Sequence, residues 1–288
     1  MSGAPPGHRP GVDRFAREGL VFDVRDGGPP DGEPVVLLHG FPQDSTAWSG
    51  VTPGLHAAGL RTLAPDQRGY SPGARPPGRS AYRVREAVDD VRALLDSAGL
   101  AGAHVVGHDW GGLVAWALAA WHPDRVRTLT VLSVPHPGAF ARALLTSPQA
   151  LQSWYMAAFQ LPLLPERLLL ARGGLLLHGT LVRSGLPAEH ADRYVARLLE
   201  PGALTAALAW YRALPWDAGD PVGRVRVPTL HVWSTRDVAL HRSGIEASGS
   251  FVRAPYTLEV LEGLPHWIPE RAPERTATLV AGHVRAAR

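Results

Sequence analysis

The segment GHDWGG at residues 107–112 places an aspartate between glycines. The apolar run AHVV comes before it, and GLVAWALAAWHP, with apolar side chains at helical spacing, follows up to Pro123. A sharp glycine-rich turn from a strand to a helix exposes its central side chain, and many hydrolases carry a serine nucleophile there. We predict that Asp109 is the nucleophile; the alternative is a glycine-rich turn with an incidental acid.

A second segment, GYSPG at residues 69–73, fits the serine-hydrolase pattern G-x-S-x-G letter for letter. Pro72 follows Ser71 directly, and further prolines and glycines follow in GARPPGR. A helix cannot begin in such a sequence, so the nucleophile turn cannot form there. We therefore interpret this segment as a loop.

An aspartate in the nucleophile position indicates a particular class of reaction. A carboxylate is suited to attack on a saturated carbon that carries a leaving group, because the product is an alkyl ester of the enzyme. Water activated by a histidine can then hydrolyse that ester. The leaving group would be an epoxide oxygen or a halide.

The remaining members of the site follow from chain order. HGFP at residues 39–42 ends an apolar run, so the amides of Phe41 and Trp110 could form an oxyanion hole. The order nucleophile, acid, histidine is expected for this kind of turn. Asp237, after the run TLHVW, is the candidate acid, and His266, in EGLPHWIPERAP, is the candidate base.

These residues need a sheet to position them, and short apolar runs predict its strands. Two helical patterns separate some of the runs, at residues 82–100 and 112–123. Strands that alternate with helices and are apolar on both faces predict an α/β fold with a mostly parallel sheet. The runs are 33–40, 59–66, 103–109, 126–134, 226–233 and 257–263.

The alternation stops at about residue 137 and resumes at about residue 222. The intervening segments have helical spacing, are separated by proline and glycine, and include no convincing strand. We predict a core in two parts, 1–136 and 222–288, with an inserted helical cap at 137–221.

Composition narrows the function classes. The absence of cysteine excludes disulfides and thiol catalysis, and the net charge of +3, with 26 acidic residues among the arginines, argues against a nucleic-acid partner. We find no metal-ligand spacing, no phosphate-binding loop and no run long enough to span a membrane. We expect a cofactor-independent, cytoplasmic protein.

The chain resembles the epoxide hydrolases of the α/β-hydrolase fold family from about residue 12 onward. The segments that carry the resemblance are HGFP (39–42), PDQRGY (65–70), GHDWGG (107–112), WYMAAFQLP (154–162), AWYRALPW (209–216), STRD (234–237) and PHW (265–267). The resemblance implies conversion of an epoxide to a vicinal diol, and it implies a cis peptide between Phe41 and Pro42.

The resemblance also implies that Tyr155 and Tyr211 donate hydrogen bonds to the epoxide oxygen. Proton donation is chemically sensible because an alkoxide is a poor leaving group. The neighbouring aromatic residues suggest a pocket for an apolar epoxide. We expect Trp154, Phe159 and Trp210 to contact substrate, with cap core as their alternative role.

Dehalogenases that share the aspartate nucleophile are the main alternative. Haloalkane dehalogenases typically have asparagine where Phe41 stands. Fluoroacetate-type dehalogenases, which act on a halogenated acid, have arginines where Trp110 and Leu113 stand and a histidine in place of Tyr155. A non-catalytic binding protein of this fold would be expected to have lost part of the site, yet every member is present.

Overall fold

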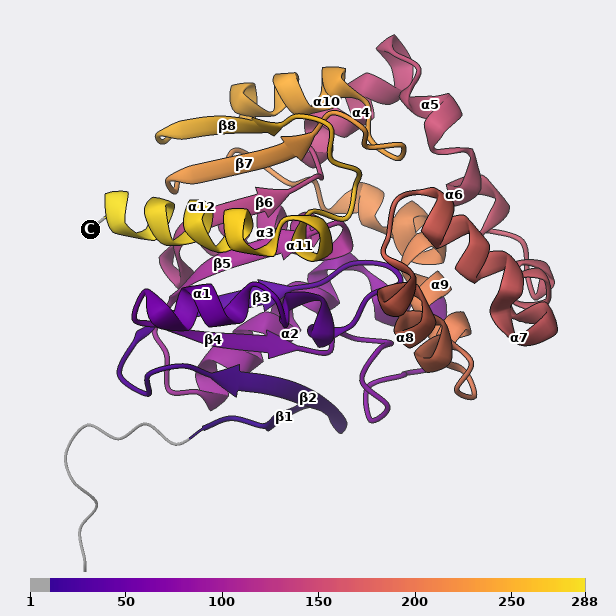
Figure 1. Cartoon of the computed structure of the whole chain (residues 1–288), viewed down its shortest axis with the longest axis horizontal. Coiled ribbons are helices and arrows are strands. Elements are labelled where there is room, and N and C mark those ends of the chain that lie inside the picture. The colour runs from indigo at the N-terminus through magenta and orange to yellow at the C-terminus, as the bar shows by residue number, and fades with distance from the viewer. Residues whose placement is uncertain (1–10, 288) are drawn as a thin grey trace, which may run out of the picture.

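The computed structural model describes residues 11–287. Within this range the chain forms one eight-stranded sheet with the strand order β1-β2-β4-β3-β5-β6-β7-β8 (Figure 1). The strands are β1 Arg14–Arg17, β2 Leu20–Gly27, β3 Glu33–Leu38, β4 Leu60–Pro65, β5 Ala103–His108, β6 Val126–Leu132, β7 Thr229–Ser234 and β8 Tyr256–Leu261.

The strands β3 to β8 are parallel to one another, and each corresponds to one of the predicted apolar runs. The hairpin β1–β2 pairs antiparallel to β4 at the edge of the sheet and was not predicted. Its sequence, RFAREGLVFDVRDG, mixes charged and apolar residues because one face of this edge meets solvent. The predicted mostly parallel α/β-hydrolase fold is confirmed.

Helices cover both faces of the sheet. The α-helices are α1 Thr52–Ala57, α2 Val84–Ser97, α3 Trp110–Trp121, α4 Pro137–Thr146, α5 Gln149–Gln152, α6 Trp154–Ala158, α7 Leu164–Arg183, α8 Ala188–Leu198, α9 Ala203–Ala213, α10 Arg242–Ala247, α11 Ile268–Arg271 and α12 Pro273–Ala286. Short 3-10 helices lie at Ser45–Trp48, Arg79–Tyr82, Pro123–Arg125, Leu214–Gly219 and Ser248–Phe251.

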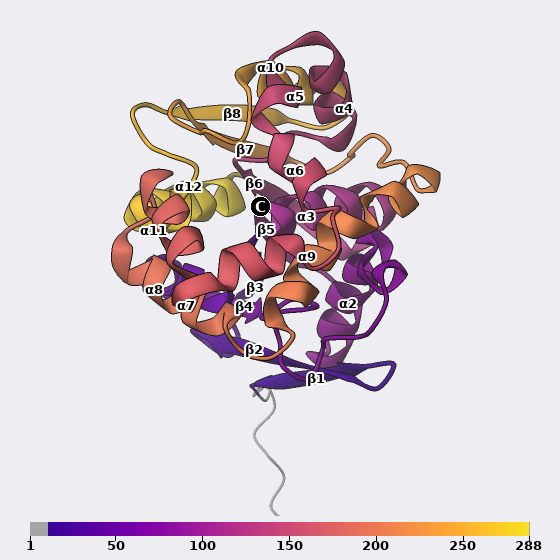
Figure 2. The same cartoon turned by 90° about the vertical axis from the view of Figure 1, so that its right-hand side faces the viewer.

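The helices α1 and α12 lie side by side on one face of the sheet, and α2 and α3 lie on the other (Figures 1 and 2). The helix α3 is apolar nearly all round, and most of its residues are buried because it packs against the central strands β5 and β6. The residue that joins β5 to α3, Asp109, is thereby fixed at the carboxyl ends of the parallel strands.

The helices α4 to α9 all fall between β6 and β7, and α6 to α9 lie beyond the carboxyl ends of the strands (Figure 1). We propose that this cap spans residues 137–221 and that the core comprises 1–136 and 222–288, of which residues 1–10 and 288 lie outside the described range. No helix in residues 11–287 combines the length and apolarity needed to cross a membrane.

Candidate active site

Asp109 follows β5 directly and precedes Trp110, the first residue of α3. Its backbone has φ 51° and ψ −122°. Such a conformation costs about 1–3 kcal/mol for a residue with a side chain. A Cβ at Gly107 would overlap the carbonyl of Gly111, and a Cβ at Gly111 would overlap the carbonyl of Leu38. The glycines let strand and helix approach closely, and the turn between them presents the Asp109 carboxylate.

One of the two amides predicted for the oxyanion hole contacts that carboxylate. The Phe41 N–H donates to Asp109 Oδ1 at 2.7 Å. The Phe41–Pro42 peptide is cis, as predicted. Trp110 is the first residue of a helix, so its N–H has no acceptor within the helix. Burial by itself raises the pKa of Asp109, but the proximity of His266 and the Phe41 amide lower it overall, and the carboxylate stays ionised.

The predicted base and acid lie together beside the predicted nucleophile, Asp109. His266 Nδ1 is 2.8 Å from Asp237 Oδ2, and His266 Nε2 is 3.7 Å from Asp109 Oδ2. The other oxygen of Asp237 accepts the N–H groups of Ala239 (2.8 Å) and Leu240 (3.0 Å). The Asp237 carboxylate is fully buried and held at both oxygens, so it can fix the imidazole in one orientation.

The two carboxylates decide the charge of His266. Burial alone would lower the pKa of this imidazole, but the charges of Asp237 and Asp109 and its hydrogen bonding raise the pKa to about 10. His266 is therefore protonated near neutral pH, beside the ionised Asp109.

The two cap tyrosines lie next to each other, with ring centroids 6.0 Å apart. Tyr155 is on α6 and Tyr211 is on α9. The Tyr211 ring stands edge-on to Trp110, at 4.9 Å, and to Phe41, at 5.5 Å. Burial and the charge of Asp109 raise the pKa of both hydroxyls, so each keeps its proton and can donate it.

A buried ion pair holds α9 against the start of α7. Arg212, next to Tyr211, contacts the Glu166 carboxylate at 2.6 Å. The same guanidinium donates to the carbonyls of Phe159 (2.9 Å) and Leu161 (2.8 Å). These bonds fix the end of the segment that carries Tyr155 relative to Tyr211. No sequence pattern predicts this pair, because Glu166 and Arg212 are far apart in the chain.

Asp109, Tyr155 and Tyr211 line one cavity of about 160 Å³. The rest of its lining is almost entirely apolar. These lining residues are Trp110, Leu113, Val134, Pro135, Pro137, Phe140, Met156, Leu214 and Leu240. Several of them follow β6, and loops at the carboxyl ends of parallel strands are where α/β sheets place their ligands. That rule could have located them from the sequence.

Trp154, Phe159 and Trp210, which were expected to contact substrate, are not among the residues that line this cavity. Trp154 is 69% exposed, because neighbouring residues on a helix point about 100° apart and Tyr155 takes the inward direction. Trp210 is buried, and its indole donates to the Arg68 carbonyl at 2.9 Å. Phe159 packs against Tyr155 and Tyr211.

Buried polar residues behind His266 were also missed. His108 directly precedes Asp109, at the end of β5. Its Nδ1 lies 2.8 Å from Gln43 Oε1, and its Nε2 lies 3.0 Å from the His266 carbonyl oxygen. Gln43 Oε1 also accepts the Gly40 N–H, and Gln43 Nε2 donates to Glu270 Oε1 at 2.6 Å. These contacts link the turn before Phe41 to the backbone of His266.

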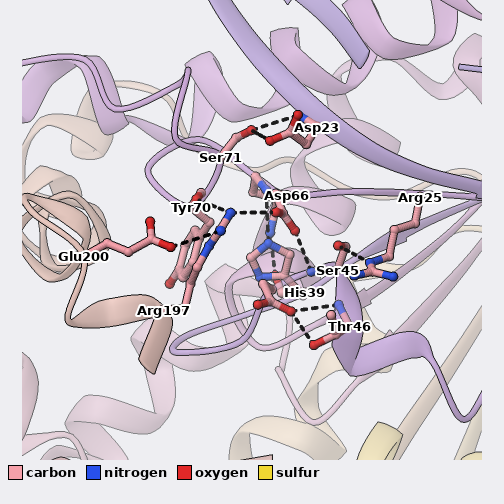
Figure 3. A network of polar contacts seen from close by, with 12 residues as sticks. Asp23, Arg25, His39, Ser45, Thr46, Asp66, Tyr70, Ser71, Arg197 and Glu200 are labelled. Carbon is pink, nitrogen blue, oxygen red and sulfur yellow. Dashed lines mark hydrogen bonds and ion pairs between the residues drawn. The ribbon is translucent and has the colours of Figure 1, made fainter. Parts of the chain in front are cut away.

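Another polar network anchors that turn to the cap (Figure 3). Burial lowers the pKa of His39, so the imidazole is neutral and its Nε2 accepts the Gln67 N–H at 3.0 Å. Asp66 accepts the Ser45 N–H at 2.8 Å and lies 3.2 Å from the Arg197 guanidinium of α8. The Asp66 carboxylate thereby links α8 of the cap to the short helix that follows the Phe41–Pro42 turn.

Within residues 11–287, no three His, Asp or Glu side chains are arranged to hold a metal ion. A carboxylate and two tyrosines line the cavity, and a hydrogen-bonded histidine lies beside the carboxylate. Such a set can do nucleophilic and acid–base chemistry.

Comparisons with known proteins agree with this geometry. Residues 33–273 match the family described as the alpha/beta hydrolase fold. The chain is 35% identical over 273 residues to the AB hydrolase superfamily protein YfhM of Bacillus subtilis, covering 93% of this chain and 95% of that protein. It is 32% identical over 284 residues to epoxide hydrolase 3 of Xenopus tropicalis, covering 94% and 76%.

Among solved structures, epoxide hydrolase A of Mycobacterium thermoresistibile superimposes with a TM-score of 0.82 at 26% identity. The superposition covers 94% of this chain and 97% of that chain.

Proposed function

This chain belongs to the epoxide hydrolases of the α/β-hydrolase fold family, and we propose that it converts an apolar epoxide to a vicinal diol through an alkyl ester of Asp109. The observation that carries the mechanism is that Asp109 lines one cavity with Tyr155 and Tyr211, while His266 approaches the same carboxylate. The apolar lining supports the substrate class.

In the first half-reaction, Asp109 attacks a carbon of the epoxide ring. Oδ1 is held by the Phe41 amide, so Oδ2 is the oxygen available for attack. The carbon–oxygen bond of the ring breaks, and its electron pair goes to the epoxide oxygen. A hydroxyl proton from Tyr155 or Tyr211 neutralises that oxygen. The product is an ester between Asp109 and the opened substrate.

In the second half-reaction, water attacks the ester carbon of Asp109 and His266 Nε2 takes the water proton. Alkylation removes the negative charge of Asp109, which is one of the two charges that raise the pKa of His266. The imidazolium thus becomes easier to deprotonate once the ester has formed; it gives its proton to the tyrosinate left by the first half-reaction and acts on water in its neutral form. The amides of Phe41 and Trp110 stabilise the oxyanion. Its collapse breaks the bond to the alkyl oxygen, which takes the remaining proton of the added water, so the diol leaves and the Asp109 carboxylate is regenerated.

The direct test is product analysis over a panel of aryl and alkyl epoxides, run beside haloalkanes and haloacids of similar size. We expect diol release from apolar epoxides and no halide release, because the site offers proton donors to a departing oxygen. Halide release without diol formation would contradict the proposal.

Replacement of Asp237 by Asn tests which of the two half-reactions depends on this carboxylate. The first step does not need His266 as a base, whereas the second does. By analogy with other triads, we expect ester hydrolysis to slow by roughly 10³-fold or more in Asp237→Asn, with ester formation changed less than about 10-fold. Single-turnover quenched-flow measurements give both rates. Equal slowing of the two steps would assign Asp237 a structural role.

A further inference from the structure

The outer side of the cap exposes an unusual concentration of apolar side chains. Of the fourteen large hydrophobic side chains that are exposed in residues 11–287, ten lie between residues 145 and 182. The most exposed are Leu145 (88%), Leu151 (78%), Trp154 (69%), Leu163 (61%) and Leu175 (60%). They come from α4 to α7 and the connections between them, and we call this surface the apolar cap face. Single exposed leucines are common, but ten exposed apolar side chains on consecutive elements are unusual, and large exposed apolar patches mark binding sites.

The exposed charges on the same segment are of one sign. Residues 137–185 contain four arginines, Arg142, Arg167, Arg172 and Arg183, all exposed. Their only carboxylate, Glu166, is buried and paired with Arg212. Within the described residues, none of the four arginines is in an ion pair with a carboxylate. The apolar cap face therefore carries positive charge with no acidic side chain of its own segment to balance it.

Arginine and leucine also meet in a shallow hollow on this face. The helix α7 is interrupted from Ala171 to Gly174, where Arg172, Gly173 and Gly174 have φ of 52°, 69° and 82°. The break opens a hollow of about 310 Å³ lined by Leu168, Ala171, Arg172, Leu175, Leu176 and Arg183. Guanidinium groups thus lie directly beside leucine side chains. This arrangement matches a lipid, in which a phosphate and an acyl chain lie next to each other.

We propose that the apolar cap face docks on the surface of an anionic lipid bilayer. The leucines and Trp154 would enter the boundary between headgroups and acyl chains, and the arginines would contact the lipid phosphates. A second copy of the chain fits less well. A symmetric dimer through this face would set the same patch against itself and oppose arginine to arginine.

Docking would bring the cavity close to the membrane. Trp154 is exposed on the cap face, while the next two residues, Tyr155 and Met156, line the cavity. If the proposed function holds, an apolar epoxide dissolved in the bilayer would be delivered at this side of the molecule. The docking itself needs no catalysis, so it can be tested separately.

Co-sedimentation with vesicles is the test. We expect the full chain to sediment with phosphatidylglycerol vesicles and to remain in solution with phosphatidylcholine vesicles, with binding weakened by added salt. Leu163→Gln/Leu168→Gln should reduce the partition coefficient at least about 10-fold, since each leucine loses its burial. Arg167→Gln/Arg172→Gln should reduce binding to anionic vesicles by a similar factor.

The control variants replace exposed apolar or arginine side chains by glutamine at positions away from the cap. Val21→Gln removes an exposed apolar side chain from β2, and Arg224→Gln/Arg226→Gln removes two exposed arginines before β7. We expect both controls to bind as the wild type does, and all variants to open a water-soluble epoxide at the wild-type rate.

Several outcomes would overturn the proposal. The proposal is overturned if the wild-type protein stays in solution with anionic vesicles. It is also overturned if the cap variants and the control variants lose equal amounts of vesicle binding. Sedimentation equilibrium tests for a dimer. If the wild type is a dimer that does not bind vesicles, and Leu163→Gln/Leu168→Gln is a monomer, the face binds a second copy of the chain instead.

Discussion

A His266→Gln variant mixed with a competent epoxide is expected to gain the mass of one substrate molecule, attached to Asp109. Glutamine occupies a similar volume but cannot take a proton from water. Ester hydrolysis should therefore slow by at least roughly 10²–10⁴-fold, while ester formation continues. Intact-protein mass spectrometry would detect the adduct, and digestion followed by fragmentation would locate it.

This expectation depends on the position of His266 relative to the nucleophile. Its Nε2 is 3.7 Å from Asp109 Oδ2, beside the attacking atom rather than the leaving oxygen. Loss of the imidazole removes the general base of the second step. It also removes a positive charge that lowers the pKa of Asp109, but the Phe41 amide remains to stabilise the carboxylate.

Two variants serve as controls. His266→Gln/Asp109→Asn should form no adduct, because the amide is not a nucleophile. His178→Gln, a cap histidine 31% exposed and paired with Asp192, should turn over without accumulating one. If His266→Gln leaves no adduct with an epoxide that the wild type consumes, direct attack by water on the substrate would replace the proposed role of Asp109.

The sequence was most informative where one strand and one turn determine a residue's position. The turn at Asp109 needs only β5, α3 and the glycines around it, all within a few consecutive residues. Chain order then selected Asp237 and His266, and the structure brings them within 2.8 Å of each other. Local pattern and fold order together were enough to select all three residues.

Side-chain direction in the cap was less predictable. The aromatic residues Trp154 and Trp210 adjoin the two cap tyrosines in sequence, yet one faces outward and the other packs in the core. Short helices such as α6 show no full period from which an inward face could be assigned. Which side faces the cavity depends on contacts such as Arg212 with Glu166, and these join distant segments.

Buried polar contacts between distant residues could not be predicted either. His108 and Gln43 are 65 residues apart, and each has an unremarkable sequence neighbourhood. The alternation of side chains along β5 predicts that His108 points away from Asp109's side. The alternation does not predict that the His108 ring nitrogens contact the Gln43 side chain and the His266 carbonyl.

Replacing both cap tyrosines is the second change with a large expected effect. Tyr155→Phe and Tyr211→Phe each remove a hydroxyl while they keep the ring and its packing. General-acid assistance is typically worth 10²–10⁴-fold, but the remaining tyrosine can partly compensate in a single variant. We expect each single variant to lose roughly 10-fold in ester formation and the double variant to be nearly inactive towards epoxides.

Tyr82→Phe is the matched control, since Tyr82 is also buried but donates to the Pro76 carbonyl, outside the cavity. It should keep the wild-type rate. All the variants should remain folded, because no ring is removed and no cavity opens, and thermal unfolding would verify this.

The rate of ester formation in the double variant separates two explanations of the same geometry. Tyr155 and Tyr211 lie beside Asp109 either because they give a proton to the departing oxygen or because aromatic rings pack well there, as Tyr211 does against Trp110. Packing survives the loss of a hydroxyl, whereas proton donation does not. A double Phe variant that opens epoxides at close to the wild-type rate would make the tyrosines packing residues, and the site would lose the feature that separates it from a dehalogenase.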